Sequence, residues 1–229
     1  MSEKRLSNQY RADLLSLSTH LLAMGGVVEQ QAVRAIGSLK HFDPTAFPAI
    51  LASEQRINAM EREIDETLHN VIARRQPAAR DLRFLVAVSK CSSNLERAAD
   101  EAGTIGKCAE RIRESSESGC VDQSEILTSG QLAIDLLRRA LDAFARMDAT
   151  AATQVKLDDR AIDVQFRGFT RRMGPYMAEN PRVISVAIEY LFAAKAIERI
   201  GDHAKNIAEL VVYVVEGQDI RHIKRPLEH

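Results

Sequence analysis

Two pairs of carboxylates recur in this sequence with the same spacing and similar neighbours. Glu96 and Asp100 lie in the stretch LERAADEAGTIGK, and Glu198 and Asp202 lie in IERIGDHAKNIAE, 102 residues later. Residues four apart on a helix project from one side of it, about one turn apart. Like charges in that arrangement repel each other, at a cost of roughly 0.2–0.5 kcal/mol per pair. A bound cation would relieve the repulsion, so the spacing indicates a cation site.

Further oxygen-bearing side chains precede each pair. Glu54 and Asn58 are four residues apart, and Asp159 and Asp163 repeat that spacing. Neighbouring helices pack about 8–10 Å apart, so these side chains could converge with the acid pairs on one patch per half. The second patch would then carry four acids, whereas Asn58 leaves the first with three. Because carboxylates attract divalent cations more strongly than carboxamides do, we expect tighter metal binding in the second half.

The same acids also have simpler interpretations. One pair of acids four apart is typical of a solvated helix face, and its recurrence could be inherited from a duplication. Glu66 and His69 form a single Glu-x-x-His, whereas ferritin-like di-iron sites need two on separate helices. Glycine-rich phosphate loops and the serine or zinc hydrolase motifs are absent, so we predict no catalytic residue and no organic cofactor site. The residues leave open a regulatory module, a metal-dependent enzyme and a structural scaffold.

Long amphipathic helices must position these acids. Between Tyr10 and Lys40, apolar residues recur at steps of three and four, which predicts a helix. Gly174-Pro175 is expected to end a later helix. No segment alternates apolar and polar residues for long, so the fold class should be all-α. The other predicted helices cover 45–75, 78–113, 123–147, 149–173 and 181–216.

The six predicted helices fall into two related halves. Arg97 matches Arg199 at the same offset as the acid pairs, 102 residues. Earlier in each half the offset is 105 residues, and the change falls in a turn, where insertions are tolerated. The serine-rich segment 114–122 separates the halves. We therefore predict a tandem duplication of a three-helix bundle, with repeats at 1–115 and 122–226.

Composition limits the partners and the location. Hydrophobic residues make up 45% and charged residues 28% of the chain, and the net charge is −1. This balance gives no whole-chain attraction to nucleic acid or anionic lipid, although it leaves a local charged patch open. We expect membrane contact only through partners. No stretch reaches the roughly 18–20 apolar residues of a membrane helix, and no signal peptide is recognisable, so we expect a cytoplasmic protein. Three scattered cysteines argue against a disulfide framework.

Three stretches resemble the PhoU family, the accessory regulators of phosphate-specific transport. They are LLAMGGVVEQQAVRAI, RQPAARDLRFLVAVSKCSSNLERAAD and ERIGDHAKNIAELVVYVVEGQDIRH, and the likeness covers nearly the whole chain. The resemblance implies two repeated three-helix bundles packed side by side. It also implies that the Glu-x-x-x-Asp motifs bind clusters of iron, zinc or another divalent metal, with Glu96, Asp100, Glu198 and Asp202 as ligands.

The resemblance further implies a function and partners. Family members contact the ATPase subunit of a phosphate ABC transporter and a membrane sensor histidine kinase, and they restrain phosphate uptake and the phosphate-starvation response. We therefore expect a regulator without catalysis, and also a homodimer; the alternative is a carboxylate-bridged metal-dependent enzyme of helical-bundle type. In the first motif Lys107 stands where the second has Glu209, on the side of the helix that carries Glu198, which makes the first half less acidic.

Overall fold

Seven α-helices and one 3-10 helix make up the part of the chain that the computed structural model describes, residues 2–41, 43–77, 79–117 and 119–219. No strand occurs among these residues, so the predicted all-α fold is confirmed. Residues 220–226 of the predicted second repeat lie outside the described part. The elements are α1 (Ser2–Lys40), α2 (Ala46–Arg75), α3 (Ala79–Glu114), α4 (Ser124–Arg146), α5 (Ala149–Asp158), α6 (Arg160–Glu179), η1 (Pro181–Val183) and α7 (Ile184–Glu216).

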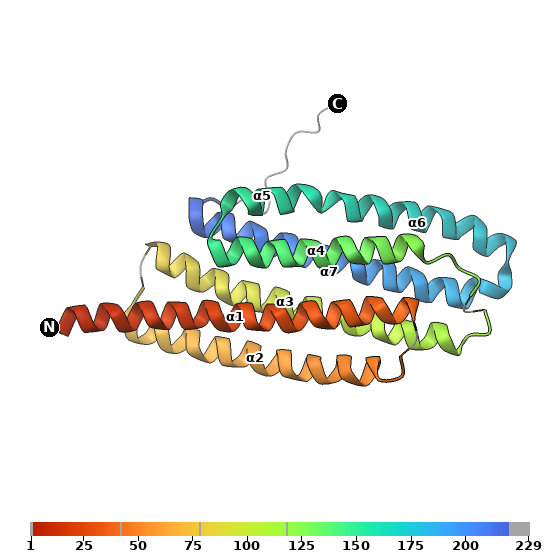
Figure 1. Cartoon of the computed structure of the whole chain (residues 1–229). Coiled ribbons are helices and arrows are strands. Elements are labelled where there is room, and N and C mark those ends of the chain that lie inside the picture. The colour runs from red at the N-terminus through yellow and green to blue at the C-terminus, as the bar shows by residue number, and fades with distance from the viewer. Residues whose placement is uncertain (1, 42, 78, 118, 220–229) are drawn as a thin grey trace, which may run out of the picture.

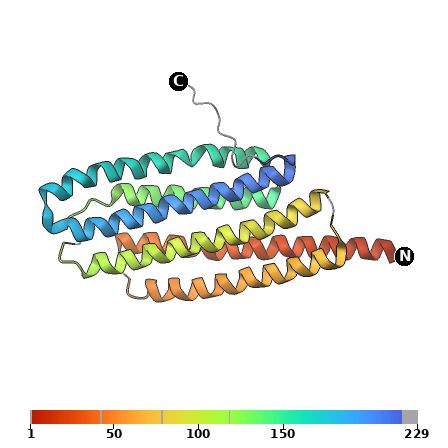
Figure 2. The same cartoon turned by 180° about the vertical axis from the view of Figure 1, so that it is seen from behind.

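The two halves are three-helix bundles that lie side by side (Figure 1). α1 and α4 are nearer the viewer in Figure 1, and α3 and α7 are nearer in the opposite view of Figure 2. α3 and α7 are antiparallel, because Arg111 near the end of α3 contacts Glu189 near the start of α7. With α2 along one edge and α5–α6 along the other, these helices form one broad surface, which we call the four-helix face (Figure 2).

The predicted apolar stripes form the core. Leu17, Leu21, Met24 and Val28 of α1 are fully buried, as the spacing of three and four residues predicted. Burial of such stripes against neighbouring helices supplies most of the stability of a helical bundle. The stripes are one-sided, and none of the described helices combines the length and the hydropathy that a membrane span requires.

Two reciprocal contacts join α1 to α4. A Cβ atom on Gly25 would lie 2.7 Å from the Leu141 methyl groups, and one on Gly130 would lie 2.6 Å from Cγ2 of Ile36. Gly25 and Gly130 are 105 residues apart, as are Ile36 and Leu141, so the duplication relates the two contacts. Each half therefore places an aliphatic side chain over a glycine of the other half.

The predicted fifth helix differs from the structure in two ways. It continues through Pro175 to Glu179, although Gly174-Pro175 was expected to end it. Both residues are exposed, so water can bond the carbonyl group that a proline leaves without its usual partner. A one-residue break at Asp159 also divides the helix into α5 and α6. Asp159 keeps helical dihedral angles, φ −51° and ψ −34°, and the two parts follow one another closely (Figure 1).

Candidate functional site

The predicted ligand residues gather in two groups, one in each half. Their side chains come from α2 and α3 in the first half, and from α6, α7 and the α5–α6 junction in the second, all helices of the four-helix face (Figure 2). The first acidic patch consists of the carboxylates Glu54, Glu61, Glu96 and Asp100, of which Glu61 was not predicted. Asn58 lies one turn after Glu54 on α2 and carries no charge. The second acidic patch consists of Asp159, Asp163 and Asp202, whose charges act on one another, and of Glu198, one turn before Asp202 on α7.

Carboxylates crowd around Glu96 in the first acidic patch. Partial burial raises the pKa of Glu96, and the negative charges of Asp100, Glu61 and Glu54 raise it further. The neighbouring Arg97 guanidinium acts in the opposite direction but does not cancel these effects. The ionised form of Glu96 is therefore disfavoured here, which is the electrostatic condition that a bound cation would relieve.

Small or neutral side chains accompany these acids. Glu61 accepts a hydrogen bond of 3.0 Å from the Ser93 hydroxyl, and Oε2 of Glu54 lies 3.2 Å from where a Cβ on Gly103 would be. Sequence reasoning missed Glu61, although it follows Glu54 by seven residues and Asn58 by three and so lies on the same side of α2. That spacing is the signal that could have identified it.

The second acidic patch contains its own cation. Asp159 is only 3% exposed, and its Oδ2 accepts a hydrogen bond of 2.9 Å from the Lys205 ammonium group, which also donates to Oδ1 of Asp202 at 3.3 Å. Burial raises the pKa of Asp159, while Lys205 opposes this shift and Asp202 and Asp163 reinforce it. Burial lowers the pKa of Lys205, but the two carboxylates more than compensate and raise it above its usual value. Lys205 therefore carries a positive charge at neutral pH within this patch.

A second lysine neutralises Glu198. The Lys195 ammonium donates a hydrogen bond of 2.5 Å to Oε2 of Glu198, one turn along α7. It also lies 5.3 Å from the centroid of the Phe166 ring on α6, within the range of a cation–π interaction. Glu198 thus has a partner within the chain and is not free to hold a metal without breaking this pair.

Residues at equivalent positions of the two halves give the two patches different charges. Lys195 and Lys205 correspond to Ser93 and Gly103 at the offset of 102 residues, and Phe166 corresponds to Glu61 at the offset of 105. Each patch therefore holds four carboxylates, but only the second contains lysines. The expectation of tighter metal binding in the second half was based on acids alone and left out Glu61 and both lysines.

Neither patch is arranged as a finished metal site. Within the described ranges, no three Asp, Glu, His or Cys side chains are gathered closely enough to hold a metal ion. In the second patch Lys205 bridges Asp159 and Asp202, so the donor set does not suit a metal. In the first patch a metal would require side chains such as Glu54 and Glu96 to rotate towards a common point. The iron or zinc ligands implied by the resemblance therefore stay a prediction.

Polar side chains join α3 to α7 between the two patches, and the sequence did not predict them. Arg199 donates a hydrogen bond of 2.9 Å to Glu101 across this junction. Burial lowers the pKa of His203, which favours the neutral ring. Its Nδ1 lies 3.1 Å from Oδ1 of Asn94, which also accepts a hydrogen bond from Asn206 at 3.1 Å. These contacts fix how the two halves meet on the four-helix face.

Glu209 does not belong to the second acidic patch. It was expected on the same surface as Glu198, but it is only 4% exposed. Its Oε1 lies 2.8 Å from the Lys156 ammonium group of α5. α5 therefore covers this end of α7, which periodicity within α7 alone could not reveal.

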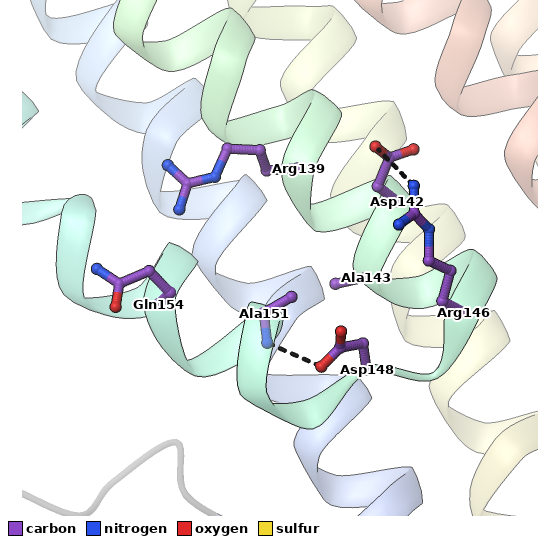
Figure 3. Close-up of a pocket in the computed structure, with 7 residues that line it drawn as sticks. All are labelled: Arg139, Asp142, Ala143, Arg146, Asp148, Ala151 and Gln154. Carbon is purple, nitrogen blue, oxygen red and sulfur yellow. Dashed lines mark hydrogen bonds and ion pairs between the residues drawn. The ribbon is translucent and has the colours of Figure 1, made fainter.

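A separate pocket of about 330 Å³ lies where α4 ends and α5 begins (Figure 3). Asp148 caps α5 there by accepting a hydrogen bond of 2.9 Å from the backbone N–H of Ala151. Arg146 pairs with Asp142 at 3.8 Å, and Arg139 pairs with Asp158 at 2.6 Å. Because carboxylates balance both guanidinium groups, the pocket offers no clear excess of positive charge for an anion. The lining residues are Arg139, Asp142, Ala143, Arg146, Asp148, Ala151 and Gln154.

Sequence matches to known proteins cover almost the whole chain. The family model of the PhoU domain matches twice, at residues 21–109 and 126–211. A phosphate-specific transport system accessory protein PhoU homolog from Burkholderia sp is 45% identical over 97% of this chain and 95% of that protein. The phosphate-specific transport system accessory protein PhoU of Escherichia coli is 38% identical, over 96% and 90% of the two chains.

Solved structures agree with these sequence relationships. The crystal structure of PhoU from Pseudomonas aeruginosa matches with a TM-score of 0.88 and 41% identity, covering 91% of this chain and all of that one. The phosphate transport system regulatory protein PhoU from Streptococcus pneumoniae matches with a TM-score of 0.85 and 25% identity, covering 92% and 99%. Since sequence and fold agree over nearly the full length and the domain model matches both halves, the chain belongs to the PhoU family.

Proposed function

We propose that this protein is an accessory regulator of phosphate-specific transport, which restrains phosphate uptake and the phosphate-starvation response when phosphate is plentiful. The observation that supports this proposal is the 45% identity over 97% of the chain to a protein named as an accessory protein of the phosphate-specific transport system. Its proposed partners are the ATPase subunit of a phosphate ABC transporter and a membrane sensor histidine kinase. The protein meets both from the cytoplasm, as a homodimer and without catalysis of its own.

In this proposal the first acidic patch is the cation site. Partial burial and the three neighbouring carboxylates raise the pKa of Glu96, and Ser93 and Gly103 stand where the second patch has lysines. A divalent cation such as iron or zinc would supply the positive charge that Lys195 and Lys205 supply in the other half. Cation binding would then change the charge that this part of the four-helix face presents to a partner.

A complementation assay tests the proposed role. A strain that lacks its own PhoU protein receives this chain, and phosphate uptake and a phosphate-starvation reporter are measured in phosphate-rich medium at equal protein levels. We expect the wild-type chain to restore repression. Failure to restore it, with the folded protein present at normal level, would refute the proposed role.

Variants in the same assay test the cation site. Glu96→Gln with Asp100→Asn should weaken repression, because the variant retains two fewer carboxylates in the first acidic patch. The matched control is Glu179→Gln, which removes an exposed acid at the end of α6. If the double variant represses as fully as the control, the first acidic patch is not the functional surface.

The alternative of a metal-dependent enzyme is tested directly. Protein loaded with iron or zinc is screened for phosphatase and oxidase turnover, and a regulator without catalysis should show none above the metal alone. Turnover that disappears in the Glu96→Gln, Asp100→Asn variant would establish the enzyme instead.

A further inference from the structure

An exposed apolar row runs along the first half of α7. Ile184, Ile188 and Phe192 are 40%, 39% and 55% exposed. Their spacing of four residues places them on one side of the helix, facing away from the buried side that includes Tyr190. Single exposed apolar residues are ordinary on soluble proteins, but an aligned row that ends on a half-exposed phenylalanine is typical of a contact surface.

Positive charge surrounds this row. Three ion pairs lie along the same part of α7, and in each the cation is far more exposed than the carboxylate beneath it. The surface is therefore basic even though each cation is formally paired. The pairs, with the exposed fractions of the two side chains, are Arg111–Glu189 (62% and 17%), Lys195–Glu198 (43% and 13%) and Arg199–Glu101 (56% and 15%).

We propose that this surface, which we call the α7 ridge, binds an acidic amphipathic helix of a partner protein. The ridge consists of Ile184, Ile188, Phe192, Arg111, Lys195 and Arg199. Its length from residue 184 to residue 199 is about 22 Å, or roughly four helical turns, which suits one partner helix lying alongside α7. Apolar residues of that helix would cover Phe192, and its carboxylates would meet the exposed cations. The inference rests on the proposed function only in supposing that the regulator has a protein partner.

The charges favour a partner helix over two other occupants. A second copy of the chain that met the ridge with its own ridge would bring like charges together. An anionic membrane that lay flat on the four-helix face would also meet the exposed carboxylates of Asp100 and Asp202, farther along that face. A single helix along α7 can end before these acids and so avoids their repulsion.

The first half lacks the same anchor. At the offset of 102 residues, Leu82 and Val86 correspond to Ile184 and Ile188, but Lys90 stands where the second half has Phe192. Aromatic residues dominate the binding energy of many interfaces, whereas lysine is depleted from them. The inferred site is therefore confined to the second half, although the two halves share a fold.

A synthetic peptide tests this inference. The probe is a fluorescein-labelled amphipathic helix of about 20 residues, with leucines at one face spaced by three and four residues and glutamates beside them, and a second peptide carries lysines in place of the glutamates. Binding to the full chain is followed by fluorescence anisotropy. We expect the glutamate peptide to bind and the lysine peptide to bind at least about tenfold more weakly. Phe192→Ser should weaken the glutamate peptide about tenfold.

A matched variant distinguishes binding at the α7 ridge from nonspecific hydrophobic binding. Leu15→Ser removes a side chain of α1 that is 69% exposed and lies outside the four-helix face, so it should leave binding unchanged. Absence of binding, or an equal loss in both variants, would overturn the inference. A change from dimer to monomer in sedimentation of Phe192→Ser would assign the ridge to a second copy. Phe192-dependent binding to phosphatidylglycerol vesicles would assign it to membranes. Failed complementation by the wild-type chain would refute the proposed role without affecting this binding test.

Discussion

Lys205 lies 2.9 Å from Oδ2 of Asp159, so an ammonium group of the chain itself neutralises the carboxylate of a residue that is only 3% exposed. The corresponding position in the first half is Gly103, which carries no charge. Duplicated helices have therefore come to differ in how their acids are balanced. The second acidic patch is balanced from within, whereas the first has no lysine at the equivalent positions.

Replacement of Lys205 by glutamine should destabilise the protein by about 1–3 kcal/mol at pH 7, since the buried Asp159 loses a charged hydrogen-bond partner. Urea unfolding measures the change. The control Lys90→Gln alters an exposed lysine of α3 and should change stability by less than about 0.5 kcal/mol. Adding Asp159→Asn to Lys205→Gln should recover part of the loss, because the unpaired charge disappears. Equal unfolding midpoints for Lys205→Gln and the control would show that this pair contributes nothing.

The first acidic patch, which contains no lysine, should bind a divalent cation more tightly than the second, although both hold four carboxylates. In calorimetric titration with Zn²⁺ or Mn²⁺, Glu96→Gln with Asp100→Asn should remove most of the binding, and Glu198→Gln with Asp202→Asn should remove little. Lys205→Gln should create additional binding, because Asp159 and Asp202 then lack their ammonium partner. If the second pair of substitutions removes more binding than the first, the original expectation from the acids alone is correct.

The crowding around Glu96 predicts how stability changes with pH. Burial and the neighbouring Asp100 hold its pKa above the usual range in the folded state, so the folded protein keeps this proton to higher pH than the unfolded chain does. That contribution to stability is complete below the unfolded pKa of about 4.3 and is lost as pH rises through the folded value. Glu96→Gln should abolish this decrease in stability with rising pH.

Urea unfolding of the wild type and Glu96→Gln from pH 4 to pH 7 measures the effect. The difference in stability between the two proteins should shift in favour of the variant as the pH rises. The control Glu179→Gln alters an exposed acid at the end of α6 and should follow the wild type. Parallel curves for wild type and Glu96→Gln would contradict the assigned pKa shift.

The helices could be predicted from sequence because their stripes repeat within each helix. Leu17, Leu21 and Met24 are buried as their spacing requires. The passage of α6 through Pro175 could not be predicted in the same way, since it depends on solvent access to a freed carbonyl group.

Within the candidate site, only the contacts between residues of the same helix could be predicted from the sequence. The proximity of Glu96 and Asp100 follows from their spacing of four residues. The contact of Lys205 with Asp202, three residues earlier, follows in the same way. The bond from Lys205 to Asp159 joins two helices, and its existence depends on how α7 packs against the α5–α6 junction. The contrast between the halves therefore required the structure, although every residue that creates it is visible in the aligned repeats.

The reciprocal contacts of Gly25 and Gly130 predict that a side chain added at either glycine destabilises the packing of α1 against α4. Gly130→Ala would bring a methyl group to 2.6 Å from Ile36, whose branched side chain cannot easily turn aside, whereas Gly25→Ala would meet the more adaptable tip of Leu141 at 2.7 Å. Overpacking costs about 1–3 kcal/mol, and the better helix propensity of alanine returns up to about 1 kcal/mol. We expect Gly130→Ala to lower the free energy of unfolding by about 1–2 kcal/mol and Gly25→Ala by less. The control Gly26→Ala meets no atom within 4 Å and should stabilise slightly. Thermal and urea unfolding of the three variants measure this order, and a Gly130→Ala protein as stable as Gly26→Ala would show that α1 and α4 are free to move apart.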